Sequence, residues 1–199
     1  KGITELIENS IRMIKQGSNL ASETTTALAG VMVGAKQATD LIEEIGVDAT
    51  RYFFVSKAAN TPFDFDIGLA KSKSNENPVY YAQYAHARMC SIKAQAAKAN
   101  VTYSQNYDLL INNKEIELVK HINEFRATII DGAVNRAPHK IANYVQRLAQ
   151  LFHSFYNECY VIDENNLELS GQRLALVEAA RITMANALSL IGVSAPEKM

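Results

Sequence analysis

Three side chains suited to nucleic-acid recognition are spaced to share one face of a helix. Tyr81, Tyr84 and Arg88 stand three and four positions apart, a spacing that places them on the same side of an α-helix. A tyrosine ring can stack on an unpaired base, and a guanidinium can bind phosphate. Ordinary half-buried core tyrosines with hydrated hydroxyl groups are the alternative that spacing alone leaves open.

The residues around this face predict where its helix begins and how it packs. Pro78 suits the first helical position, where its missing N–H costs no hydrogen bond, and Asn77 is a good N-cap. A neighbouring face is small and apolar, and it predicts packing against another helix; it consists of Ala82, Ala85, Met89 and Ile92.

A second group of aromatic and basic side chains belongs to a later helix, opened by Pro138. Tyr156 and Tyr160 stand four apart near its end, where surface or capping aromatics are the plain alternative to a binding role. Three cations on its flank are candidates for phosphate contacts or for a solvated face: Arg136, Lys140 and Arg147.

Composition excludes several classes of protein. The chain has 199 residues and a net charge of −1, so it has no overall positive field, and RNA binding requires a local patch. It has no run of apolar residues long enough to predict a membrane span, and no secretory signal. Cys90 and Cys159 lack the close spacing of metal ligands and are predicted to be reduced thiols, and we expect no metal site.

Hydrophobic periodicity predicts an all-α fold. A first helix should end near Gly17, a loop should cover residues 18–34, and further helices should start near residue 39 and cover residues 49–55. About five helices follow from Val79 onward, and Gly192 is placed to end the last of them. Short strand candidates remain near residues 31–33 and 160–162. The sharpest core stripe has coiled-coil-like spacing and consists of Ile141, Val145, Leu148, Phe152 and Phe155.

Three separated segments resemble one family in the correct order. NPVYYAQYAHAR, preceded by RYFFVSKAANTPFDFDIGLAKSKS, is similar to the junction between the catalytic and anticodon-binding domains of bacterial-type class I arginyl-tRNA synthetases. Residues 141–161 and 172–199 resemble the last helices of that family, including its terminal methionine. The resemblance covers residues 40–199, whereas residues 1–37 depart from the family pattern.

The resemblance implies a fold and a domain division. We expect residues 75–199 to form a helical-bundle anticodon-binding domain of the class I synthetase type. Residues 1–74 would be a small, mostly helical remnant of the catalytic half with the junction. The HIGH and KMSK-type signatures of class I catalysis are missing, and the four histidines are scattered. We therefore expect no catalytic residue and no cofactor in this segment, with ATP, magnesium and L-arginine used only through a catalytic domain.

The resemblance also implies a partner and a set of contact residues. The chain would be the C-terminal portion of an arginine–tRNA ligase that is cytoplasmic and monomeric, and it would bind the anticodon stem-loop of arginine tRNA. The implied contacts are Tyr81, Tyr84, Arg88, Tyr156, Tyr160 and Met199. Two other functions stay open: a stand-alone helical tRNA-binding module without aminoacylation activity, and a helical interaction protein with no RNA role.

Overall fold

The computed structural model describes residues 2–199, with side chains from residue 12 onward except at positions 14 and 17. Lys1, the first residue of the expected domain over residues 1–74, therefore lies outside the described residues. Residues 2–199 form seven helices and no strand, which confirms the all-α class. The chain divides into two compact units, one that ends at Glu44 and one from Ile45 to Met199.

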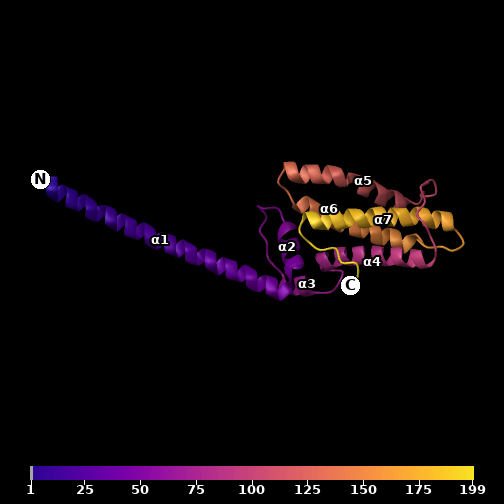
Figure 1. Cartoon of the computed structure of the whole chain (residues 1–199), viewed down its shortest axis with the longest axis horizontal. Helices are drawn as coiled ribbons and strands as arrows, with labels where there is room; N and C mark the ends of the chain where they lie inside the picture. Colours follow the sequence, from indigo (N-terminus) through magenta and orange to yellow (C-terminus); the bar gives the residue numbers. More distant parts are fainter. Residues whose placement is uncertain (1) are drawn as a thin grey trace. The chain divides into compact units, whose positions relative to one another are not determined.

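The first unit is formed by a single helix, α1 (Gly2–Ile45), whose last residue, Ile45, belongs to the second unit. Figure 1 draws it as one continuous ribbon from indigo to violet. The expected loop over residues 18–34 and the strand candidate at residues 31–33 are therefore wrong. Threonine does not exclude the helix, because its hydroxyl bonds back to the carbonyl four residues earlier, as Thr24 does to Leu20 at 2.8 Å and Thr39 to Ala35 at 3.0 Å. Gly17 does not end α1, because glycine inside a helix costs only about 1 kcal/mol relative to alanine.

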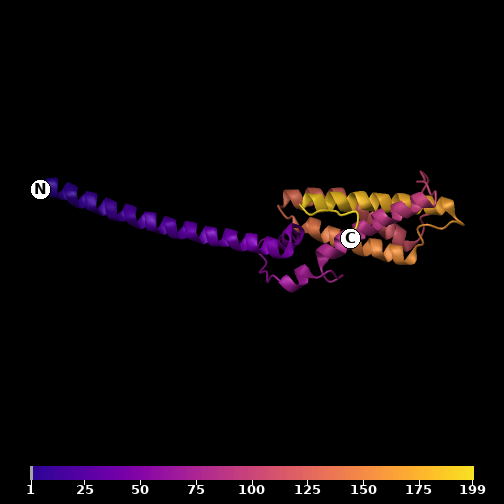
Figure 2. The ribbon, with the colours of Figure 1, turned by 60° about the horizontal axis from the view of Figure 1, so that its bottom comes forward.

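The second unit is built on four long helices. They are α4 (Pro78–Lys98), α5 (Asn113–Val134), α6 (His139–Glu158) and α7 (Leu167–Leu190). Figures 1 and 2 show them side by side, and α6 packs against α4, α5 and α7. The core stripe predicted for α6 is confirmed, because all five of its apolar residues are buried. None of the helices in residues 2–199 combines the length and apolar character that crossing a membrane requires.

Two short helices complete this core. They are α2 (Val47–Val55) and α3 (Ile67–Lys71). Tyr52 of α2 is 1% exposed, and its hydroxyl donates to the carbonyl oxygen of Ala142 at 3.0 Å. Gln146 of α6 donates to the same hydroxyl at 2.7 Å. The compact bundle therefore begins near residue 45, whereas a functional boundary between residues 74 and 75 remains a prediction.

The start of α4 follows the local signals in the sequence. The side chain of Asn77 accepts hydrogen bonds from the backbone N–H groups of Val79 and Tyr80, which confirms the predicted cap. Its amide nitrogen also donates to the carbonyl oxygens of Ala70, at 3.0 Å, and Ser72, at 2.8 Å. Asn77 thereby fixes the α3 segment to the N-terminus of α4. The second strand candidate, residues 160–162, is instead an irregular segment between α6 and α7.

Candidate nucleic-acid interface

The centre of the candidate site is a cation between two tyrosines. The Arg88 guanidinium of α4 lies over the ring of Tyr156 of α6, with 4.6 Å between the guanidinium carbon and the ring centroid. Arg88 Nη1 also lies 3.4 Å from the hydroxyl of Tyr84. All three side chains are half-buried. We call Tyr84, Arg88 and Tyr156 the Arg88 cluster. A guanidinium has five N–H donors, so most of this one's donors are available to a ligand.

A histidine supports the cluster from the bundle side. His153 of α6 stacks with Tyr84, with ring centroids 5.9 Å apart, and packs on Tyr81 at 4.8 Å. Burial, and secondarily the positive charge of Arg88, hold the pKa of His153 below its ordinary value. His153 is therefore neutral at physiological pH, and it does not repel Arg88. The ring of Tyr84 also stacks with that of Tyr80, with an interplanar angle of 9°.

A hollow of about 440 Å³ opens beside the cluster. It is lined by Tyr84, Ala87, Arg88, Ser91, Glu197, Lys198 and Met199. Met199 is 55% exposed, so its flexible thioether chain is available for contact with an aromatic ring. The structure therefore brings Met199 together with Tyr84 and Arg88.

The tail, residues 191–199, is held against α2 and α4 by a set of polar contacts. Asp48 accepts hydrogen bonds from the N–H and hydroxyl of Ser194, and Gln83 donates to both Asp48 and the Ser194 carbonyl oxygen. Further along, His86 Nδ1 lies 2.9 Å from the carbonyl oxygen of Pro196. Because a carbonyl can only accept, this nitrogen carries the proton.

The turn at the start of the tail requires a glycine. Gly192 has φ = +69°, and a Cβ there would lie 2.6 Å from Nη1 of Arg51. Arg51 uses that nitrogen to donate to the Gly192 carbonyl oxygen at 2.9 Å. The predicted stop of the last helix at Gly192 is therefore confirmed, and its conformation directs the tail toward the Arg88 cluster.

A second hollow, of about 340 Å³, has Tyr156 in its lining. Tyr156 and Tyr160 both line it, together with Ile92, Gln95, Asn157, Cys159, Val161 and Ile162. Tyr160 is 78% exposed, so its ring is free to stack. The first hollow is thus lined by Arg88 and the second by Tyr156, and these two side chains are stacked on each other.

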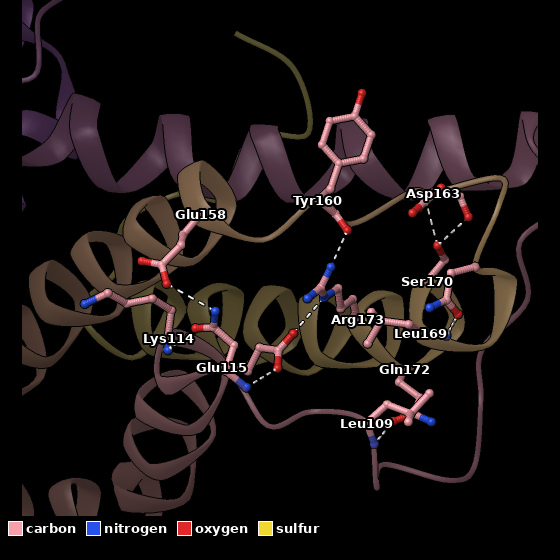
Figure 3. A network of polar contacts seen from close by, with 12 residues as sticks. Leu109, Lys114, Glu115, Glu158, Tyr160, Asp163, Leu169, Ser170, Gln172 and Arg173 are labelled. Atoms are coloured by element: carbon pink, nitrogen blue, oxygen red, sulfur yellow. Dashed lines mark hydrogen bonds and ion pairs between the residues drawn. The ribbon is translucent and has the colours of Figure 1, made fainter.

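A buried ion pair positions the segment that carries Tyr160 (Figure 3). Arg173 of α7 donates to the carbonyl oxygen of Tyr160 at 2.8 Å and, through Nε, to Glu115 at 2.6 Å. Glu115 has no exposed side-chain surface, and its other oxygen accepts from the N–H of Asn112 at 2.9 Å. Asn112 and Glu115 also form the capping box of α5. The start of α5 and the Tyr160 segment are thus fixed to the same guanidinium.

The remaining predicted residues lie elsewhere. Tyr81 packs against the core rather than lining either hollow. Arg136 and Arg147 are exposed, and Lys140 forms an ion pair with Asp131 at 2.5 Å, which lowers the pKa of that carboxyl group. Lys140 and Tyr156 are sixteen residues apart on α6, about 24 Å at 1.5 Å per residue. A phosphate contact by Lys140 would therefore be well away from the Arg88 cluster, whereas Arg147 lies only nine residues, about 14 Å, from Tyr156 along α6.

Several residues that build the site gave no sequence signal. His86, Asp48 and Gln83 hold the tail, and His153 supports Tyr84, yet each reads as an ordinary helix residue. Their partners lie on other elements, so spacing within one helix could not reveal them. Among the described residues, no group of three or more histidine, cysteine, aspartate or glutamate side chains is placed to hold a metal ion.

The fold and the site together define a class of protein. A helical bundle with an aromatic and cationic face is typical of a nucleic-acid-binding module. Residues 82–199 match the family of the DALR anticodon binding domain. The chain belongs to this family.

Individual relatives agree with the family match. An arginine–tRNA ligase of Shouchella clausii is 54% identical over 162 residues, covering 80% of this chain and 29% of that protein. A Campylobacter jejuni crystal structure named for an arginyl-tRNA synthetase is 34% identical with a TM-score of 0.69, covering 80% of this chain and 35% of that one. The Thermus thermophilus arginyl-tRNA synthetase is 26% identical with a TM-score of 0.67, covering 82% of this chain and 30% of that one. The resemblance to the C-terminal part of arginyl-tRNA synthetases is confirmed. The chain spans about three tenths of the curated relative's length.

Proposed function

We propose that the bundle from residue 45 to residue 199 binds the anticodon stem-loop of an arginine tRNA. In this proposal it serves a cytoplasmic enzyme that ligates arginine to that tRNA with ATP. The observation that carries the proposal is the Arg88 cluster, which lies inside the matched anticodon-binding domain beside the tail. One bundle would bind one RNA as a monomeric unit, because all of the proposed contacts come from a single chain.

The two hollows suggest how the face would take a loop of unpaired bases. Splayed-out bases stack on aromatic rings and on guanidinium planes. Tyr84, Arg88 and Met199 line the first hollow, Tyr156 and Tyr160 line the second, and Arg88 stacks on Tyr156. Neighbouring bases would occupy the two hollows, while Arg88 would meet the phosphate or base edge that links them. Arg136, Lys140 and Arg147 would contact the stem backbone further along α6.

We predict that Tyr84→Ala and Tyr156→Ala each weaken binding to an arginine tRNA anticodon hairpin by roughly tenfold or more. The reason is that stacking a base on an aromatic ring contributes about 1–3 kcal/mol. Binding titrations and thermal unfolding should be measured on the same variants. Tyr107→Ala is the matched control, because Tyr107 is an exposed tyrosine of a loop outside both hollows. If both variants melt at a lower temperature yet bind the hairpin as tightly as the parent chain, Tyr84 and Tyr156 are core residues and the proposed binding face is wrong.

Arg88 variants separate the charge of the cation from its shape. Arg88→Ala should reduce the slope of log K against log salt by about 1, because each neutralised phosphate releases counterions. Arg88→Lys keeps the charge and should keep that slope, but it loses the planar group that stacks on Tyr156. Arg126→Ala, an exposed arginine of α5, controls for total charge. Equal slopes for Arg88→Ala and Arg126→Ala would exclude a special role for Arg88.

We also predict that the chain alone does not activate arginine. ATP activation in the class needs a positioned cation for the leaving group, and the sequence has no lysine between Lys15 and Lys36, where the KMSK-type loop would align. Arginine-dependent pyrophosphate exchange should stay at background, with a full-length arginine–tRNA ligase as the positive control. Exchange above background would instead point to a catalytic site within these residues. Binding without exchange is equally expected of the alternative, a stand-alone helical tRNA-binding module.

A further inference from the structure

The helix α4 carries a buried histidine that lies outside the lining of both hollows. His86 is 2% exposed. Its neighbours on the helix at positions 82, 85 and 89 are Ala82, Ala85 and Met89, and each of them is 0% exposed. A polar side chain in such a place is costly unless it is hydrogen-bonded. The hydrogen bonds of His86 therefore decide what this residue contributes.

The imidazole of His86 uses one of its two nitrogens. Nδ1–H donates to the carbonyl oxygen of Pro196 at 2.9 Å, across 110 positions of sequence. The thiol sulfur of Cys90 lies 3.9 Å from the same nitrogen and is at most a weak acceptor. With the proton on Nδ1, Nε2 is an acceptor, and it is buried without a hydrogen-bond partner among the described residues. Because an unpaired buried acceptor costs free energy, stability alone does not favour histidine over an apolar residue here.

The bond to Pro196 is the second of two anchors for the tail. The tail runs from the end of α7 to α4 (Figure 1). Asp48 and Gln83 hold it first, at Ser194. His86 holds it again two residues later, at Pro196. Two anchors so close together fix the direction in which the following residues leave the bundle.

The residues that follow the second anchor line the first hollow. They are Glu197, Lys198 and Met199, and all three are exposed. Lys198 carries a positive charge and Met199 an apolar thioether, so both can meet a nucleotide, one at its phosphate and the other at its base. A segment that is already held loses less conformational freedom when it binds. The anchor at Pro196 therefore bears on affinity for a ligand in this hollow.

We propose that His86 is a positioning residue for RNA recognition. By holding Pro196 it places Lys198 and Met199 in the wall of the first hollow before the RNA binds. The inference rests on the proposed function, the binding of an anticodon stem-loop at the Arg88 cluster. His86 does not touch the RNA itself. It acts through the tail, so its effect on binding should disappear when the residues that it positions are removed.

Leucine and asparagine at position 86 separate the hydrogen bond from the volume of the side chain. The two have nearly the same shape, but only asparagine has an N–H that can replace Nδ1–H. His86→Leu should weaken binding of an arginine tRNA anticodon hairpin about fivefold, which corresponds to about 1 kcal/mol. It should not lower the melting temperature, because it also removes the unpaired Nε2. His86→Asn should restore most of the affinity. Equal affinities of the two variants would overturn the proposal.

Truncation tests whether His86 acts through the tail. A chain that ends at Glu197 lacks Lys198 and Met199 and should bind the hairpin more weakly than the parent chain. In that shortened chain, His86→Leu should cost less than about twofold further affinity, because residues that act together have non-additive effects. An undiminished loss from His86→Leu in the shortened chain would show that His86 acts through the core of the bundle, and would refute the positioning role.

A second histidine controls for the loss of a contact between histidine and a carbonyl group. His121 Nε2 of α5 lies 3.2 Å from the carbonyl oxygen of Tyr144, and His121 lines neither hollow. His121→Leu should leave the affinity for the hairpin unchanged, and an equal loss from His121→Leu and His86→Leu would count against a special role for His86.

Tyr84→Ala separates this inference from the proposed function. If Tyr84→Ala does not weaken binding, the proposed RNA face is wrong and the role of His86 falls with it. A loss of about tenfold with Tyr84→Ala but none with His86→Leu would overturn the role of His86 alone.

Discussion

Replacing Glu115 with alanine is expected to lower the free energy of unfolding of the bundle by about 3–5 kcal/mol, the usual cost of removing one partner of a buried ion pair. The Glu115 side chain has no exposed surface, and that of Arg173 is 15% exposed. Without the carboxylate, the guanidinium loses its bond to Glu115, and the N–H of Asn112 loses its acceptor. Chemical denaturation followed by circular dichroism measures the change.

A neighbouring ion pair supplies the control for Glu115. Glu117 pairs with Lys114 at 3.5 Å, and its side chain is 48% exposed. Because exposed pairs contribute about 0–1 kcal/mol, Glu117→Ala should change stability little. Glu115→Gln keeps hydrogen-bonding capacity without the charge, so its loss of unfolding free energy should lie between those of Glu115→Ala and Glu117→Ala. If Glu115→Ala and Glu117→Ala cost the same, the buried pair does not fix the Tyr160 segment as we infer.

Truncation of Tyr52 to alanine is expected to cost about 3–5 kcal/mol as well, the range for removing a buried aromatic ring. Tyr52 is 1% exposed and belongs to the same core as α4 and α6. Tyr52→Phe keeps the ring but removes the bonds to Ala142 and Gln146, so it should cost about 1–2 kcal/mol. The measurement is equilibrium denaturation of the full chain.

Phe54 is the control for Tyr52, because it lies on the same helix and is 54% exposed. Phe54→Ala should cost clearly less than Tyr52→Ala. Similar losses for both variants would show that α2 is peripheral to the bundle. In that case a compact unit starting near residue 75 would be favoured over one starting near residue 45.

The buried hydroxyl of Tyr52 also predicts how stability responds to alkali. Burial raises the pKa of Tyr52 well above its ordinary value of 10.0. The folded chain then retains a proton that the unfolded chain releases above about pH 10, so the unfolded state binds fewer protons and stability falls as pH rises. Tyr52→Phe should remove part of this loss. The stability that the protonated Tyr52 hydroxyl contributes is fully present below about pH 10.

The local features of this protein could be predicted from its sequence. The Asn77 cap followed by Pro78, the core stripe of α6 and the left-handed Gly192 each depend on residues a few positions apart, so spacing was enough to predict them. Spacing also placed Tyr84 and Arg88 on one helix face. For α1 the local signals misled, because glycine and threonine weaken a helix without forbidding it.

Which elements meet could be seen only from the packing of the helices. It placed the Arg88 guanidinium on Tyr156 of another helix, and it moved Tyr81 toward the core although Tyr81 shares a face with Tyr84. It also set the neutral His153 behind the cluster, and it tied the tail to His86. These contacts join residues distant in sequence. They depend on how helices pack and on which buried polar groups find partners, and neither is encoded in the spacing of residues along one helix.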